Sequence, residues 1–508
     1  MTLNNHIGFD NEKYLAEQTA AILERVNLFN DKLYIEFGGK ILYDYHASRV
    51  LPGFDPNVKM RLLQKLIDKI DVIMCIHAGD IERKKIRADF GITYDSDALK
   101  TIDDFNDWGI PVTAVVITRY QDQSPAKTFR NKLERNGIKV YTHKCTKGYP
   151  TDIDSIVSDD GYGANEYILT TKSIVVVTGP GPGSGKLATC LCNLYHDYRH
   201  GIKAGYAKFE TFPIWNLPLN HKVNIAYEAA TIDLKDLVLI DHHHLEAYNI
   251  KTVNYNRDVE AFPLLRRIFE KITGEASMYK SPTDMGVNRA ASGITDDALV
   301  QEASHQEIIR RYFRCACEYV MGMAEKESLN RAEMIMDKVN ARVEDRKVVK
   351  PARNSALDAL NQNKGNAGVY CGAALELKDG TIITGKNSPL MHAASSLVLN
   401  ATKHLAGLPD NMYLLPKNII DSVTYLKKDI LNGKVASLDL EETLIVLGIS
   451  ALSNPAAQMA LENLKHLKDC EVHLTHIPTP GDEAGLRKLH VNLTCDPEFS
   501  SKSLFMSN

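Results

Sequence analysis

The sequence contains no long apolar run, and this absence excludes several classes of protein. No stretch of eighteen apolar residues occurs among its 508 residues, and the first fourteen, MTLNNHIGFDNEKY, are largely polar. A bilayer-spanning helix needs about 20 apolar residues, and an export signal needs an apolar core near its start. We therefore expect no membrane partner and a cytoplasmic protein.

A surplus of basic residues is also missing. The 60 Lys and Arg residues are outnumbered by 64 Asp and Glu residues, giving a net charge of −4. Nucleic-acid binding normally needs a basic surface, so no nucleic-acid partner is expected.

Nine cysteines are scattered along the chain, and the pairs Cys190/Cys192 and Cys315/Cys317 lie at a spacing that directs side chains apart on a helix. The spacing predicts reduced, buried thiols and no metal.

Low-complexity tracts and short repeats are absent, which argues against a solenoid. A chain of 508 residues, 44% hydrophobic, exceeds what one core supports. We expect a phosphate- or nucleotide-binding domain over 1–256, a helical extension over 257–345, and a smaller C-terminal α/β domain over 346–508.

Apolar strands alternate with helical segments through the first half of the chain. Strands are expected in DVIMCIHAG (71–79), PVTAVVITRY (111–120), IKVYTH (138–143), SIVVVTG (173–179), GYAKFE (205–210) and DLVLIDHHH (236–244). Such alternation predicts an α/β fold with a Rossmann-like parallel sheet. The earlier segment LYIEFGGKIL (33–42) is interpreted as a hairpin around Gly38-Gly39.

The segment SIVVVTGPGPGSGKLAT (173–189) carries the strongest functional signal. A buried strand leads into a glycine-rich turn and then a helix, an arrangement that directs backbone N–H groups and the helix dipole at one point. It predicts a phosphate contact at Gly181, Gly183, Ser184, Gly185 and Lys186. The same turn also fits a purely geometric need for glycine.

Both known phosphate-binding patterns match this turn incompletely. In the P-loop pattern, Pro180 stands at the leading glycine and Leu187 stands where a hydroxyl would bind magnesium. In the dinucleotide pattern, Ser184 replaces the third glycine and the next acid, Glu210, comes late. The sequence therefore predicts a phosphate-bearing small molecule as the ligand, and a nucleotide is one such molecule.

Polar loop residues further along are candidates for the wall of the same pocket. They lie in KFETFPIWNLPLNH (208–221) and VNYNRDVEAFP (253–263), and are Lys208, Glu210, Asn216, Asn256, Arg257 and Asp258. Packed surface loops and a helix cap explain the same residues. Asp241 and His244 follow an apolar run and are ligand types of a metal-dependent phosphoesterase, a minor alternative.

The chain resembles the bacterial family described as domain of unknown function 1846. The likeness rests on TGPGPGSGKLATC, GYAKFETFPIWNLPLNH, YEAATIDLKD, VNYNRDVEAFP and SPTDMGVN. It implies a cytosolic bacterial α/β protein that forms a homo-oligomer. Asp241 and His244 match the family's pattern, whereas His242 and His243 depart from it.

The C-terminal part is similar to cytidine deaminases that have lost their zinc site. The similarity rests on CGAALELKDGTIITGKNS, MHAASSLVLNATK and SNPAAQMALENL. His392 stands for the first zinc ligand, but Ala394 replaces the catalytic glutamate, and Ala456 and Met459 replace the two thiolates. The resemblance implies a domain without deaminase chemistry.

Taken together, the sequence predicts a protein that binds a phosphate-bearing ligand at residues 181–186, with Lys186 neutralising charge. A transferase fits this site, and catalysis would then come mainly from preorganised positive charge. A non-catalytic metabolite sensor or scaffold fits it as well, and the sequence leaves open which of the two the chain is.

Overall fold

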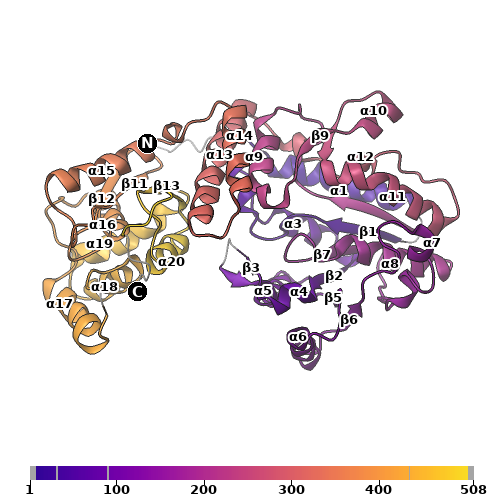
Figure 1. The fold of residues 1–508 in the computed structure, drawn as a ribbon, viewed down its shortest axis with the longest axis horizontal. Helices are drawn as coiled ribbons and strands as arrows, with labels where there is room; N and C mark the ends of the chain where they lie inside the picture. The colour runs from indigo at the N-terminus through magenta and orange to yellow at the C-terminus, as the bar shows by residue number, and fades with distance from the viewer. Residues whose placement is uncertain (1–6, 30–31, 88–90, 434, 502–508) are drawn as a thin grey trace. The chain divides into compact units, whose positions relative to one another are not determined.

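Runs of β-branched and aliphatic residues form a parallel sheet in the computed structural model, which describes residues 7–29, 32–87, 91–433 and 435–501. The polar segment MTLNNH (1–6) lies outside these ranges. Six strands pair in the order β6-β5-β2-β7-β1-β8 (Figure 1). Their bounds are β1 Lys32–Phe37, β2 Ile70–His77, β5 Ala114–Thr118, β6 Val140–His143, β7 Ile174–Thr178 and β8 Ala204–Phe209. The predicted α/β fold is confirmed.

Helices cover both faces of this sheet, because successive strand residues point to opposite sides. On β2, Ile73 and Cys75 belong to the core that contains residues of α8 and α11, whereas Met74 and Ile76 belong to the core under α5 and α6. The helices of this part are α1 Asn11–Leu28, α2 Tyr45–Val50, α3 Val58–Lys65, α4 Ala78–Glu82, α5 Tyr94–Asp107, α6 Ser124–Arg135, α7 Ile153–Ile156, α8 Lys186–Arg199, α9 Lys222–Ala230, α10 His242–Tyr248, α11 Asn256–Thr273 and α12 Pro282–Met285.

The strand order reverses direction at β7. From β1 the chain runs through β2 and β5 to the edge strand β6, then returns to insert β7 between β2 and β1, and ends at β8 on the other edge. The helices that follow β2 and β7 therefore lie on opposite faces, which opens a crevice at the carboxyl ends of these two strands. The glycine-rich turn begins at this crevice.

Two strand predictions were wrong. Residues 33–42 form no hairpin, because β1 is buried along its whole length as a central parallel strand. The segment 236–244 does not join the main sheet, because β9 (Val238–Ile240) pairs with β10 (Val253–Tyr255) in a separate two-stranded ribbon. A short ribbon of β3 (Ile86–Arg87) and β4 (Ile92–Thr93) precedes α5.

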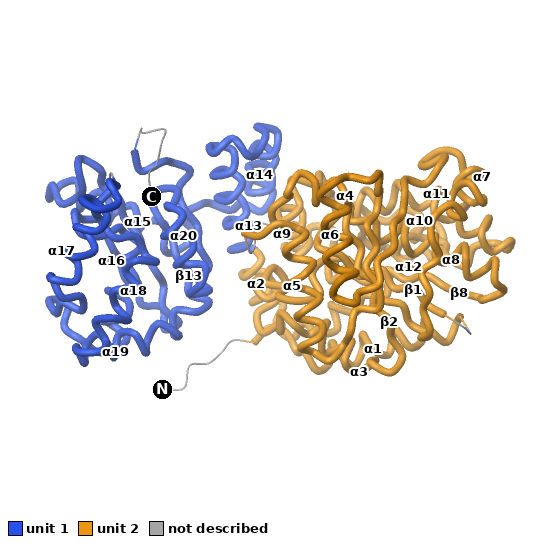
Figure 2. The backbone as a smooth tube through the Cα atoms, turned by 90° about the horizontal axis from the view of Figure 1, so that it is seen from below, with its two compact units in different colours: residues 1–5, 305–508 blue, residues 6–304 orange. Residues whose placement is uncertain are grey.

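Among the described residues the chain divides into two compact units, 7–304 and 305–501, and the division falls within α13 (Asp297–Val320) (Figure 2). In the second unit a sheet of order β12-β11-β13-β14 combines antiparallel and parallel pairs. This mixed sheet confirms the smaller α/β domain. Its elements are α14 Lys326–Lys338, α15 Val349–Asn361, β11 Gly372–Glu376, β12 Ile382–Lys386, α16 Ala393–Leu405, α17 Lys417–Tyr425, α18 Leu440–Ser450, α19 Pro455–Asn463, β13 Glu471–Leu474, α20 Pro480–Lys488 and β14 Asn492–Cys495.

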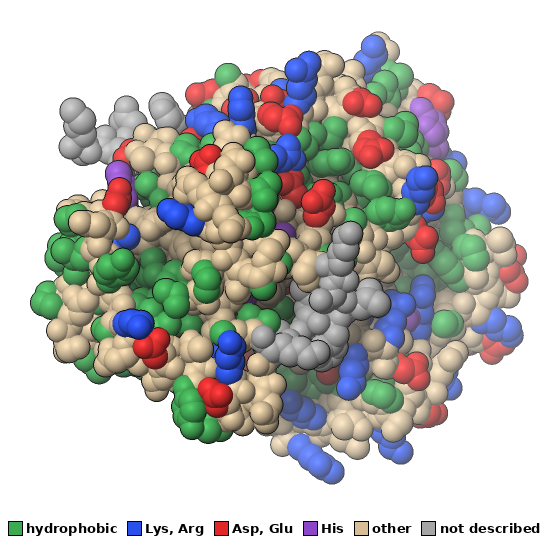
Figure 3. Space-filling model, turned by 60° about the vertical axis from the view of Figure 1, so that its left-hand side comes forward, with side chains coloured by type: hydrophobic (Ala, Val, Ile, Leu, Met, Phe, Trp, Pro, Cys, Tyr) green, Lys and Arg blue, Asp and Glu red, His purple; other side chains and the backbone are tan. Residues whose placement is uncertain are grey.

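The surface charges and the cysteines are distributed as the composition of the sequence predicts. Basic and acidic side chains are interspersed over the face in Figure 3. Cys190, Cys192, Cys315 and Cys317 are buried, as predicted, and within the described residues none of them is in a disulfide bond. None of the helices in the described part of the chain combines the length and apolar composition of a bilayer span. The homo-oligomer stays a prediction.

Candidate functional site

The turn between β7 and α8 is built from glycines that hold left-handed backbone angles. Gly183 has φ 77° and Gly185, the residue that caps α8, has φ 94°. Residues with a side chain rarely adopt these angles. The local sequence therefore fixes a sharp turn that places the first amides of α8 beside the end of β7.

Three of the glycines also allow close packing under the turn. A Cβ atom on Gly179 would lie 2.4 Å from the Cys75 carbonyl oxygen, and one on Gly181 would lie 2.6 Å from the Tyr94 hydroxyl. A Cβ on Gly185 would lie 2.6 Å from Thr118 Cγ2. Strand β2, helix α5 and strand β5 thus support the turn from below.

Several hydrogen-bond donors in the turn have no protein partner. Within the residues that the structure describes, the amides of 183–188 make no hydrogen bond, whereas Thr189 N–H already donates to the Gly185 carbonyl. The Ser184 hydroxyl is buried and also has no partner. The turn itself is held by Thr118 Oγ1 donating to the Ser184 carbonyl at 2.8 Å and by Lys186 Nζ donating to the Gly181 carbonyl at 3.3 Å. The first N–H groups of any helix lack intrahelical partners, whereas a buried hydroxyl is normally paired, so the Ser184 hydroxyl is the donor that points to a missing acceptor.

A cluster of charged side chains lies at the end of the neighbouring strands. Lys208 of β8 forms ion pairs with Asp258 of α11 and with Glu210, the latter at 3.4 Å. Glu36 of β1 stands next to Lys208 in the strand register and accepts a hydrogen bond from Tyr206 at 2.7 Å. Burial disfavours the Lys208 ammonium, but the three carboxylates outweigh it and raise its pKa.

Glu210 reaches sideways over the end of β1. A Cβ atom on Gly38 would lie only 2.0 Å from Glu210 Oε1, so the carboxylate occupies the space that a side chain at position 38 would fill. Burial raises the pKa of Glu210 to about 6, although the Lys208 and Lys186 ammonium groups act in the opposite direction. The electrostatic effect of Lys186 couples this carboxylate to the glycine-rich turn.

The raised pKa predicts a pH-dependent contribution of Glu210 to stability. Its pKa is about 6 in the folded chain and close to 4.5 when exposed, so the folded state binds more protons between these values. Ionisation therefore costs about 2 kcal/mol of unfolding free energy, a loss that develops as pH rises from 4 to 7. Glu210→Gln is expected to remove this loss in denaturant titrations. An unchanged pH profile in the variant would show that Glu210 ionises normally.

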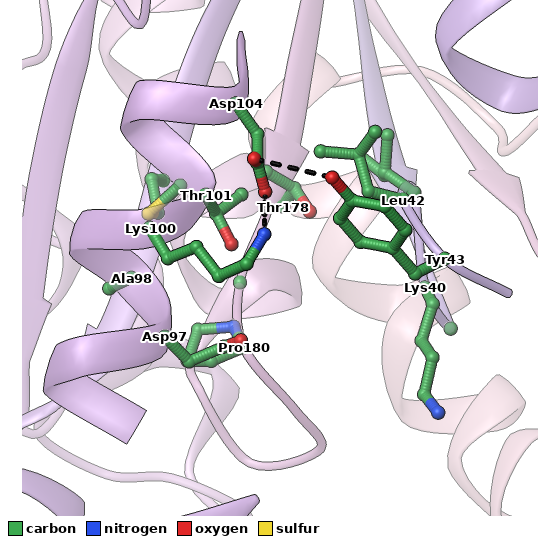
Figure 4. Close-up of a pocket in the computed structure, with 14 residues that line it drawn as sticks. Lys40, Leu42, Tyr43, Asp97, Ala98, Lys100, Thr101, Asp104, Thr178 and Pro180 are labelled. Carbon is green, nitrogen blue, oxygen red and sulfur yellow. Dashed lines mark hydrogen bonds and ion pairs between the residues drawn. The ribbon is translucent and has the colours of Figure 1, made fainter. Parts of the chain in front are cut away.

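A depression lies on the other side of the turn, toward α5 (Figure 4). It is lined by residues of the segments 39–43, 97–104 and 178–180. Lys100 Nζ lies 4.4 Å from the centre of the Tyr43 ring, and both side chains contact the Asp104 carboxylate. Tyr43 has φ 55°, an unfavourable angle for a bulky residue.

Some of the predicted site residues form one charged cluster. The others make hydrogen bonds or ion pairs with nearby residues instead. Lys208, Glu210 and Asp258 come together as described. Arg257 instead forms a two-pronged ion pair with the buried carboxylate of Asp236. The Asn256 side chain accepts a hydrogen bond from Leu237 N–H at 2.9 Å, and Asn216 is exposed on a loop.

Asp241 and His244 link α10 to the start of α12. One Asp241 oxygen caps α10 by accepting from His244 N–H, and the other accepts from the Thr283 hydroxyl at 2.6 Å. His244 Nδ1 lies 2.8 Å from the Ser281 hydroxyl. Across the described ranges, no group of three or more His, Cys, Asp or Glu side chains is arranged to hold a metal.

In the second unit His392 caps α16 and lies 2.7 Å from Asp482 of α20. Ala456 and Met459 belong to α19, and Ala394 is buried in the core under α16. The side chain paired with His392 is therefore a carboxylate at the start of α20 and not a cysteine thiolate.

Sequence reasoning missed four residues that shape the site: Glu36, Gly38, Tyr43 and Thr118. Gly38-Gly39 directly after a buried strand was the available signal, since glycines at a strand end mark close approach of other groups. Glu36 within an apolar strand was a second signal, because an acid is rarely buried without a partner.

Comparison with known sequences places the chain in a family. The model described as "Domain of unknown function DUF1846, N-terminal" matches residues 7–340, and that described as "Domain of unknown function DUF1846, C-terminal" matches residues 344–505. The chain belongs to the DUF1846 family.

Close relatives of this DUF1846 chain occur in clostridia. A "UPF0371 protein" of Clostridium botulinum (strain Kyoto / Type A2) is 58% identical over 503 residues, which cover 99% of this chain and 100% of the relative. A "UPF0371 protein" of Clostridium tetani (strain Massachusetts / E88) is 57% identical over 502 residues, with the same coverage. These relatives show the family independently of the family models.

Proposed function

We propose that the chain binds a phosphate-bearing small molecule at the glycine-rich turn. The observation that carries this proposal is the set of donors without partners, the amides of 183–188 together with the buried Ser184 hydroxyl. A phosphate group offers several acceptor oxygens and a negative charge, which the N-terminus of α8 and Lys186 both favour.

The turn differs from the magnesium site of P-loop enzymes. Leu187 stands at the position of the metal-binding hydroxyl, and its side chain packs against the hydrophobic core under α8. The residues present therefore do not fit a magnesium ion held in that manner, and we derive no hydrolysis step from it. A transferase that relies on fixed positive charge is the reaction class that the site supports.

The depression beside the turn lies where the organic part of such a ligand would extend. Tyr43 and Lys100 face it from two segments, so an aromatic ring and a cation lie next to the start of the turn. A nucleotide or a phosphorylated metabolite fits these groups. A sensor that binds without converting its ligand would use the same contacts.

Thermal shift measurements on the intact chain test the proposal. Inorganic phosphate, ATP, NAD and sugar phosphates are the probes, and at least one is expected to raise the melting temperature. Lys186→Ala should reduce this shift strongly while changing the melting temperature of the free protein much less, because the side chain is half-buried and its hydrogen bond to the Gly181 carbonyl is long, at 3.3 Å. An equal shift in the variant would argue against the site. Turnover assays on each bound probe then separate a transferase from a sensor.

A further inference from the structure

We propose that the ligand carries hydroxyl groups beside its phosphate and that Glu210 accepts hydrogen bonds from them, so that the chain selects sugar or polyol phosphates. This inference rests on the proposed function, since it assumes that the phosphate occupies the turn. It assigns Glu210 a role in ligand selection, distinct from the phosphate contacts of 183–188.

The position of Glu210 follows from the strand order. The turn begins at the end of β7, β1 is the next strand, and Glu210 follows β8 on its far side. Adjacent strands lie about 4.8 Å apart, so an acid that stayed over β8 would be about two spacings from the turn. Because Gly38 has no side chain, Glu210 leans over β1 and shortens that distance by about one spacing. Glu210 comes later in the sequence than the acid of the dinucleotide-binding pattern, but its lean over β1 brings the carboxylate closer to the turn.

The chemistry of Glu210 decides what it can bind. Its Oε2 atom faces Lys208, but in the part of the chain that the structure describes no hydrogen-bond donor reaches Oε1, and the side chain is 23% exposed. An ionised carboxylate only accepts hydrogen bonds, so a ligand group at Oε1 must be a donor. The Lys208 ammonium pairs with Oε2 at 3.4 Å, so a ligand hydroxyl at Oε1 adds a donor without replacing this ion pair.

The surrounding contacts keep Glu210 available. Lys208 is held by Asp258, and Glu36 is held by Tyr206, so neither needs Glu210 as its sole partner. At neutral pH the carboxylate is ionised, and below pH 6 it takes up a proton and becomes a weaker acceptor. Hydroxyl selection should therefore fade on acidification, while phosphate binding by backbone amides should not.

Isothermal titration calorimetry with three probes tests the inference on the full chain. Ribose 5-phosphate carries hydroxyls, n-pentyl phosphate has as many carbons without them, and inorganic phosphate reports on the turn alone. Wild-type protein at pH 7.5 is expected to bind ribose 5-phosphate about tenfold or more tightly than n-pentyl phosphate, the range of a charge-assisted hydrogen bond. Glu210→Met should abolish the preference and leave binding of inorganic phosphate unchanged.

Two further variants serve as controls for this result. Glu210→Gln retains the shape and a weaker acceptor, so it should show an intermediate preference. Glu260→Gln, which changes an exposed acid on α11, should behave as wild type. Equal binding of ribose 5-phosphate and n-pentyl phosphate by wild type, or an undiminished preference in Glu210→Met, would overturn the role of Glu210 and leave the phosphate site standing. Failure of all three probes to bind would instead contradict the proposed function itself.

Discussion

Gly183→Asp is expected to lose inorganic phosphate binding by about 100-fold or more, whereas Gly183→Asn should retain it within about threefold. At position 183 a Cβ atom meets open space, and φ is 77°. Asp and Asn tolerate this angle better than other side chains and have the same shape. Only the Asp carboxylate competes for the amides at the start of α8 and repels a bound anion.

The two variants form a matched pair, because backbone strain is common to both. Their unfolding free energies should agree within about 0.5 kcal/mol in urea titrations, since both side chains face solvent. Calorimetric titration with phosphate then isolates the effect of charge. Equal affinity of the Asp and Asn variants would show that the anion binds elsewhere.

Lys208→Met should destabilise the unit of residues 7–304 by about 3 kcal/mol at pH 7, because it leaves the carboxylates of Glu36, Glu210 and Asp258 close together without their shared cation. Loss of the cation raises the pKa of these carboxylates, so the folded variant binds more protons than the unfolded chain. The destabilisation should therefore shrink as pH falls from 7 to 5.

Denaturant titrations at both pH values measure this effect. Lys139→Met, at an exposed position before β6, serves as the control and should change stability by less than about 0.5 kcal/mol. A loss below about 1 kcal/mol in Lys208→Met, or one that does not depend on pH, would show that the three carboxylates are well solvated.

Local sequence was sufficient to predict the turn and its sheet. The run Ile174–Thr178 followed by glycines and Lys186 specifies strand, turn and helix within thirteen residues, so no distant contact is needed. The alternation of strands and helices likewise predicts parallel pairing.

Strand order and side-chain partners depended on distant contacts. LYIEF followed by two glycines is as typical of a hairpin as of a central strand, and only the insertion of β7 beside β1 decides between them. Lys208, Glu210 and Asp258 were predicted as polar loop residues at the wall of a pocket. Their link to Glu36 and the gap left by Gly38 arise from the pairing of β1 with β8, which no local pattern encodes.

A crystal structure of the chain soaked in inorganic phosphate tests the central claim most directly. The phosphate is expected in the turn, with its oxygens within hydrogen-bonding distance of the amides of 183–187 and of the Ser184 hydroxyl. A turn that stays empty at saturating phosphate, with these amides bonded to other protein groups, would contradict the account and leave the glycines a purely architectural role.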